Sequence, residues 1–164
     1  MNIFYLHHLP AIAARMHCDK HVVKMIVESC QMLATAHHVH GNGHNVSYKQ
    51  AHLNHPSTVW VRQSGEHYRW LRDMTRNLCD EFTNRYGKVH ACEQILINEL
   101  WNPPSAIADL YKWSNPPQCM PDECKHYDTV MAYRRFYMTK DSSWARTYYK
   151  GTGSRPNWME YDYV

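Results

Sequence analysis

Residues 17–33 combine titratable side chains with the spacing of an amphipathic helix. At about 100° per residue, five polar side chains fall within a stripe roughly 80° wide, and five apolar side chains lie opposite it. The stripe holds His17, His21, Lys24, Glu28 and Gln31, and the apolar side holds Val22, Val23, Ile26, Cys30 and Leu33. Imidazole and ammonium groups attract an anion, and a carboxylic acid among them can protonate a leaving group. We therefore expect the stripe to line a groove for an anionic ligand, with Glu28 as its acid.

Two other interpretations of this stripe stay open at the level of sequence. Lys24 and Glu28 are four residues apart, so they can form an ordinary salt bridge on a solvated face. His17 and His21 have the spacing of a metal-chelating pair. However, the glutamate of an HExxH motif is missing between them, and Lys20 and Lys24 would repel a cation. We predict neither a metal nor another cofactor.

The composition of the 164 residues indicates in which cellular compartment the protein is expected. None of the six cysteines forms a CxxC pair, which favours reduced thiols over a disulfide framework. No apolar run approaches the ~18 residues of a membrane span, and the first residues lack the charged and apolar regions of a signal peptide. We expect a cytoplasmic protein with no membrane partner.

Basic residues are concentrated in the C-terminal third. Residues 125–158 contain 7 Lys and Arg against 2 Asp and Glu, although the formal net charge of the whole chain is only +3. Aromatic residues alternate with these cations, and the mixture includes Trp144, Arg146, Tyr149, Arg155 and Trp158. Because cations contact phosphates and aromatic rings stack on bases, this mixture suits nucleic acid. The alternative is a helix with a solvated arginine face and an aromatic core side.

The remaining pattern predicts an all-α fold, with residues 1–164 as a single compact helical domain. We expect a short extended N-terminus, helices at 10–38, 56–86 (divided near 64–65), 89–100 and 128–138, one helical turn at 106–111 within a proline-rich loop (101–125), and an irregular aromatic tail.

Asp19 lies on the apolar side of the first helix, so it needs a buried partner such as Arg85 or a backbone N–H. Arg62, Arg69, Arg72 and Arg76 would contact phosphates if the second helical region lined the groove.

Several of these residues stand in a recognisable order. Lys20, Lys24 and Glu28 are followed by Gln31-Met32-Leu33, and some twenty residues later by Asn54-His55-Pro56 and Trp60. This arrangement resembles the signature of the pyrimidine dimer DNA glycosylase family, over roughly residues 1–88. The tail Arg155-Pro156-Asn157-Trp158-Met159-Glu160-Tyr161 is similar to the Arg-Pro-x-Trp aromatic terminus of that family.

The resemblance implies an all-α enzyme that removes a damaged base from DNA and then cleaves the backbone as a lyase. Its nucleophile would be the α-amino group at the chain start, and its acid a glutamate on the first long helix, here Glu28. An α-amine has an ordinary pKa of about 7.7–8.0, so part of it is neutral near pH 7. Such an amine can attack the sugar C1′ and leave an imine. By position, Lys20 and Lys24 match the family's basic residues, and His55 falls in its NHP element.

Two departures from the family pattern affect the proposed site. Residue 2 is Asn, whose bulk hinders removal of the initiator methionine, so the amine belongs to Met1 unless processing moves it to Asn2. Lys24 is a substitute nucleophile if the groove desolvates it. His residues stand where Arg would be expected, which indicates either a different substrate or a His-based proton transfer, here by His21. We expect His17 and Lys20 to contact DNA.

The sequence thus leaves three functional hypotheses. The first is a DNA repair glycosylase, with or without abasic-site lyase activity, that acts on damaged or modified pyrimidines. Its expected partner is damaged duplex DNA, contacted also by Arg155 and Trp158. The second is a non-catalytic nucleic-acid or nucleotide binding protein on the same scaffold, and the third is a His-dependent or metal-dependent nucleotide enzyme.

Overall fold

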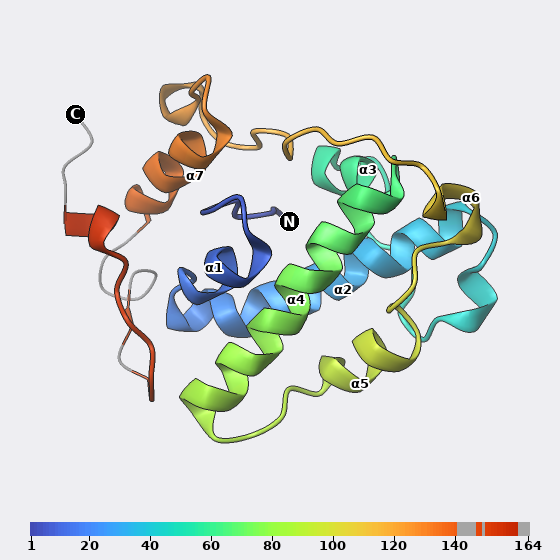
Figure 1. Cartoon of the computed structure of the whole chain (residues 1–164), viewed down its shortest axis with the longest axis horizontal. Coiled ribbons are helices and arrows are strands. Elements are labelled where there is room, and N and C mark those ends of the chain that lie inside the picture. The colour runs from blue at the N-terminus through green and yellow to red at the C-terminus, as the bar shows by residue number, and fades with distance from the viewer. Residues whose placement is uncertain (141–146, 149, 161–164) are drawn as a thin grey trace.

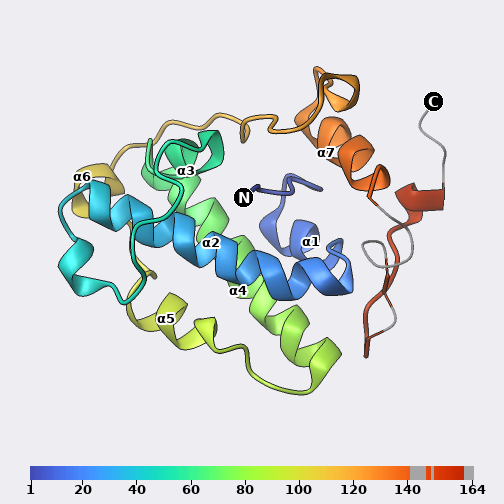
Figure 2. The same ribbon diagram turned by 180° about the vertical axis from the view of Figure 1, so that it is seen from behind.

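Helices α2 (Asp19–Val39) and α4 (Gly65–Tyr86) are the two longest elements and pack against each other at the centre of the molecule. Figure 1 shows the two helices crossing, and Figure 2 shows the same crossing from behind. The computed structural model describes residues 1–140, 147–148 and 150–160, and every regular element within those ranges is a helix. The prediction of an all-α fold is confirmed.

Shorter helices complete the described part of the chain. They are α1 (Pro10–Arg15), α3 (Pro56–Val61), α5 (Cys92–Asn98), α6 (Ser105–Ala108) and α7 (Thr129–Met138), with 3-10 turns η1 (Gly43–Asn45), η2 (Asp122–Cys124) and η3 (Asn157–Glu160). The predicted division of the second helical region near residues 64–65 is confirmed, because Ser64 caps α4 by accepting a hydrogen bond from the His67 N–H. No helix in these described ranges is long and apolar enough to cross a membrane.

The predicted continuous helix over residues 10–38 is wrong, because the chain is interrupted between α1 and α2. Cys18 is extended, with φ −67° and ψ 163°. Its N–H donates to the Tyr137 hydroxyl at 2.7 Å, and the Asp19 N–H donates to the Thr147 carbonyl at 2.9 Å. Because these N–H groups are bonded to distant parts of the chain, they leave the helical ladder, and α2 begins afresh at Asp19.

A buried ion pair joins the start of α2 to the end of α4. Arg85 Nη1 lies 3.2 Å from Asp19 Oδ1, and it also donates to the His17 carbonyl at 2.8 Å. Arg85 further pairs with Glu81, one turn earlier on α4, at 3.0 Å. The expectation that Asp19 is buried with Arg85 as its partner is confirmed.

Residues 101–121, which we call the strap, link α5 to α7 and run across α3 and the start of α4 (Figure 1). The Gly65 N–H donates to the Leu110 carbonyl at 3.1 Å, and Trp60 Nε1 donates to the Ser114 carbonyl at 3.0 Å. A Cβ atom on Gly65 would lie 2.6 Å from the Ala108 carbonyl oxygen. Glycine at this position therefore allows the strap to approach the helix closely.

The first residues of the chain run into the middle of the molecule, among α1, α3 and α7 (Figure 1). Ile3 and Leu6 are fully buried. Arg134 on α7 donates to the Leu6 carbonyl at 3.1 Å, and Trp70 on α4 donates to the His8 carbonyl at 2.8 Å. Two helices thus hold this segment in place, and with it the free amino group of Met1.

Candidate active site

The amino group of Met1 lies beside the carboxylate of Glu28 on α2. Its nitrogen is 3.8 Å from Glu28 Oε2, and Lys24 Nζ is 3.2 Å from Oε1 of the same carboxylate. The Glu28 side chain is only 14% exposed, whereas that of Lys24 is 67% exposed. One carboxylate therefore faces two ammonium groups. The excess positive charge suits a phosphodiester next to the amine.

His55 adds an imidazole to this group at the start of α3. Its Nδ1 accepts a hydrogen bond from the Ser57 N–H at 3.2 Å and so caps the helix. Burial lowers the pKa of His55, and the positive charge of the Met1 amine lowers it further, while Glu28 opposes the shift. In the neutral ring, an Nδ1 that accepts a hydrogen bond leaves the proton on Nε2. His55 thus has an N–H donor left over for a ligand.

The structure therefore gathers Met1, Lys24, Glu28 and His55 at one place, and it leaves the side chain of Asn2 out. Asn2 is buried, and its amide nitrogen donates to the Cys119 carbonyl at 2.9 Å. The side chain of residue 2 is bound to the strap instead of facing the carboxylate.

The predicted polar stripe is wrong at its N-terminal end, where both histidines lie in the core. His17 precedes α2, is fully buried, and has its Nδ1 2.7 Å from the Ala13 carbonyl. The His21 ring stacks on Phe4 with centroids 4.5 Å apart, and its Nδ1 lies 2.9 Å from the Tyr137 hydroxyl. Burial lowers the pKa of His17 to about 4 and that of His21 to about 3. At neutral pH both rings are uncharged, and both are buried in the protein.

Arg62 and Arg69 are bonded to backbone carbonyls of the protein itself. Arg62 Nη1 donates to the Leu53 carbonyl at 2.6 Å, which fixes the loop before α3. Arg69 Nη2 donates to the Ala108 carbonyl at 2.7 Å, which fixes the strap. Both side chains have structural partners where the sequence suggested phosphate contacts.

Arg72 and Arg76 are paired with carboxylates. Arg72 lies 2.8 Å from Asp73, and Arg76 lies 2.9 Å from Asp80 and 3.1 Å from Glu93. Because these pairs neutralise the guanidinium charges, this face of α4 is not the row of unpaired cations that the helical pattern suggested. The pairing with Glu93 also attaches α5 to α4.

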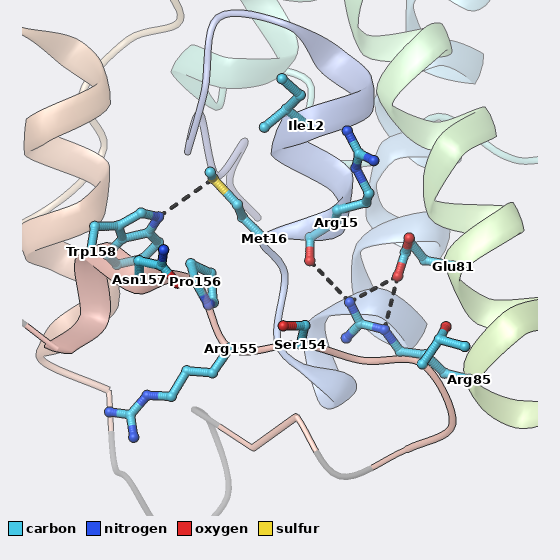
Figure 3. A pocket seen from close by; sticks show the side chains of 11 residues that line it. Ile12, Arg15, Met16, Glu81, Arg85, Ser154, Arg155, Pro156, Asn157 and Trp158 are labelled. Carbon is cyan, nitrogen blue, oxygen red and sulfur yellow. Dashed lines mark hydrogen bonds and ion pairs between the residues drawn. The ribbon is translucent and has the colours of Figure 1, made fainter.

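The predicted C-terminal DNA contacts, Arg155 and Trp158, line a separate pocket of about 390 Å³ (Figure 3). Trp158 is buried, and its Nε1 donates to the Met16 sulfur at 3.4 Å, so it packs in the protein instead of offering a free ring to a base. Arg155 is exposed, and Figure 3 shows its guanidinium pointing away from Arg85. Met1, Glu28 and His55 are not among the residues that line this pocket. Trp144, Arg146, Tyr149 and Tyr161 lie outside the described residues.

Lys140 belongs to the charged surroundings of the site but was not singled out from the sequence. Its Nζ lies 3.9 Å from the centroid of the Phe136 ring. Burial lowers the pKa of Lys140, and the positive charge of Lys24 lowers it further. Lys24 and Lys140 are therefore close enough to repel each other, which favours an anion between or beside them. Lys20, in the first turn of α2, is exposed.

A groove of about 460 Å³ adjoins His55 on the side of the strap. It is lined by Asn54, Pro56, Val59, Trp60, Gln63, Ser114, Asn115 and Pro117. None of these side chains is charged, and the three amides can donate to and accept from the edge of a base. Such a lining suits a nucleobase better than a phosphate.

Among the described residues, no three or more His, Cys, Asp or Glu side chains lie together in a way that could hold a metal ion. All six cysteines are free thiols, as their spacing predicted.

The site thus combines the amino group of Met1, an adjacent glutamate and an exposed lysine, which are groups that can form an imine and contact an anion. The family model of pyrimidine dimer DNA glycosylases matches residues 1–94, which is more than half of the chain. The chain belongs to the pyrimidine dimer DNA glycosylase family, and the predicted resemblance is confirmed. The family also indicates DNA repair as the process and DNA as the substrate. No curated protein and no solved structure matches the chain.

Proposed function

We propose that the chain is a DNA glycosylase with abasic-site lyase activity, and that it acts on damaged or modified pyrimidines through an imine. Family membership supports DNA as the substrate. The observation that carries the proposal is the 3.8 Å distance between the Met1 amino nitrogen and Glu28 Oε2. A primary amine and a carboxylate at this distance can exchange protons while the amine forms a bond to carbon.

The glycosylase step begins with attack of the neutral Met1 nitrogen on C1′ of the damaged nucleotide. The N–C1′ bond forms, the bond from C1′ to the base breaks, and the base leaves with the electron pair and takes a proton from water. Glu28 then accepts a proton from the attached nitrogen and delivers it to the ring oxygen. The C1′–O4′ bond opens as the nitrogen lone pair forms the C=N bond of a protonated imine.

The lyase step uses the same two groups. The Glu28 carboxylate removes a proton from C2′, the electrons form a C2′=C3′ double bond, and the 3′ phosphate leaves with the C3′–O electrons. The imine serves as the electron sink that makes the C2′ proton acidic. Water finally hydrolyses the imine and regenerates the Met1 amine.

Lys24 is better suited to a phosphate than to the nucleophilic role. A nucleophilic lysine needs a dry site that favours its neutral form, whereas the Lys24 side chain is 67% exposed. We assign Lys24, together with Lys20 and Lys140, to contacts with the DNA backbone. We assign the His55 Nε2–H to an oxygen of the substrate, and the neutral groove beside His55 to a base.

The proposal is tested by reduction with borohydride in the presence of damaged DNA. Wild-type protein is incubated with a duplex that contains a thymine dimer, and separately with one that contains an abasic site. Borohydride reduces an imine to a stable amine, so a covalent protein–DNA adduct is expected with both damaged duplexes and not with undamaged DNA. Glu28→Gln and Lys24→Gln serve as variants, and only Glu28→Gln should lower the rate of strand cleavage by about 10²–10⁴-fold.

The outcome also separates the alternative functions. Tight binding of damaged DNA with no adduct and no released base would contradict the proposal and support a non-catalytic binding protein. An adduct that disappears in Lys24→Gln but persists when the Met1 amine is blocked by an added N-terminal dipeptide would assign the nucleophile to Lys24.

A further inference from the structure

The side chain of Met1 is anchored in the protein although its amine faces Glu28. That side chain is only 1% exposed. The Thr58 hydroxyl donates a hydrogen bond to the Met1 sulfur at 3.3 Å, and Thr58 is itself fully buried in the first turns of α3. The helix that presents His55 therefore also holds the side chain of Met1.

The side chain of Asn2, the residue after Met1, makes three hydrogen bonds. Its Oδ1 accepts from the Ile3 N–H at 2.9 Å and from the Tyr133 hydroxyl at 2.9 Å. Its Nδ2 donates to the Cys119 carbonyl of the strap at 2.9 Å. The Tyr133 hydroxyl also lies within hydrogen-bond distance of the Pro117 carbonyl. Residue 2 is thus clamped between α7 and the strap, both of which lie beyond the residues matched by the family model.

This clamp determines where a free amine can be. If Met1 were removed, the new amine would belong to Asn2, one residue or about 3.8 Å of backbone further along the chain. The hydrogen bonds that join Asn2 to Tyr133 on α7 and to the Cys119 carbonyl of the strap oppose its movement into the vacated place beside Glu28. In addition, removal of an initiator methionine requires a small second residue, and Asn is not small.

We infer that the chain keeps Met1, that the Met1 amine is the reacting amine, and that Thr58 and Asn2 are its positioning residues. This inference rests on the proposed function. It also gives the strap a role, since the strap carries the carbonyl that holds Asn2.

The first test is the intact mass of the purified full chain and of its borohydride adduct. The wild-type mass should include Met1, and digestion of the adduct should place the DNA remnant on the peptide that begins at Met1. A mass lacking Met1, with an adduct on Asn2, would overturn the inference but leave the proposed imine chemistry standing. Absence of any adduct from the wild-type chain would instead contradict the proposed function.

The second test compares two forms of the chain that differ only in their first residue. A cleavable N-terminal fusion is cut so that the chain begins either at Met1 or at Asn2. Both forms keep the Asn2 side chain and every other side chain. Since a misplacement of about 1 Å costs on the order of 10²-fold in rate, the form without Met1 should be trapped at least about 10²-fold more slowly than the form with Met1. Equal trapping rates would overturn the inference.

The role of Thr58 is tested by a matched pair of substitutions. Thr58→Val keeps the shape but lacks the hydroxyl donor, whereas Thr58→Ser keeps the hydroxyl. At saturating abasic DNA, Thr58→Val should lower the single-turnover rate of adduct formation several-fold without changing the Kd for DNA, and Thr58→Ser should restore most of it. A change in Kd alone, or no difference between the two variants, would remove Thr58 from the positioning residues.

Discussion

The Met1 amino nitrogen lies 3.8 Å from Oε2 of Glu28, so the start of the chain and α2 meet at one point. Glu28 is mostly buried, and its Oε1 also forms an ion pair with Lys24 Nζ at 3.2 Å. Under the proposed function, this carboxylate moves protons for the amine, and the two ammonium groups beside it attract a phosphate of DNA.

Replacement of Glu28 should separate chemistry from binding. Because Glu28→Gln cannot carry protons, we expect the single-turnover rate of strand cleavage to fall by about 10²–10⁴-fold. The loss of a negative charge next to the amine should leave the affinity for DNA unchanged or raise it. Cleavage assays and gel-shift titrations on the same duplex measure both. Parallel losses of rate and affinity would show that Glu28 acts in binding.

His55 has two functions that two substitutions can separate. His55→Ala removes both the helix cap and the ring, whereas His55→Ser restores a capping oxygen for the Ser57 N–H. We expect the alanine variant to be less stable than the serine variant by about 1 kcal/mol in urea unfolding. Both variants should cleave abasic DNA about 10²-fold more slowly, because both lack the Nε2–H donor. Full activity of His55→Ser would limit His55 to capping.

The buried histidines predict a loss of stability in mild acid. His17 and His21 have folded-state pKa values lowered by burial to about 4 and about 3, below the ordinary value near 6.5. Between these values the unfolded state binds more protons than the folded state. The free energy of unfolding should therefore fall as the pH drops from about 6.5 toward 4, by about 1.4 kcal/mol per unit for each ring.

Urea unfolding at a series of pH values measures this slope. His21→Phe keeps an aromatic ring against Phe4 and should reduce the slope, although it loses the bond to Tyr137. His44→Gln, at an exposed histidine in η1, is the control and should leave the slope unchanged. A flat dependence of stability on pH in wild-type protein would show that the two rings are accessible to protons.

The choice of cations that bind DNA is tested by salt dependence. Lys140 lies near Lys24 and interacts with it electrostatically, whereas Arg76 is paired with Asp80 and Glu93. We expect Lys140→Gln to weaken DNA binding and to reduce the slope of log K against log salt by about 1. Arg76→Gln should leave that slope nearly unchanged. The reverse result would return the phosphate contacts to α4.

The sequence predicted those parts of the fold that depend on local pattern or on a single pair of residues. Apolar spacing and capping residues predicted α4 and α7 well, and the position of Asp19 on an apolar face correctly implied a partner such as Arg85. The motif that joins Glu28 to His55 also pointed to groups that the structure brings together. The single domain over residues 1–164 and the cytoplasmic location stay predictions.

The incorrect predictions depend on contacts between residues far apart in the chain. His17 and His21 have helical spacing with Glu28, but Phe4 and Tyr137 surround them and turn that part of the stripe into core. Phosphate contacts by the arginines of α4 stay a prediction. Nothing in local sequence reveals that the strap returns to bind Arg69, whereas Arg72 and Arg76 have partners close in the sequence, Asp73 and Asp80.

The central claim is most directly tested by locating the borohydride-trapped DNA remnant on the wild-type chain. Protein is trapped on an abasic duplex, digested, and the modified peptide is sequenced by mass spectrometry. We predict a single modification on the α-nitrogen of Met1. A remnant on Lys24 or on another side chain, with the Met1 amine unmodified, would contradict the account.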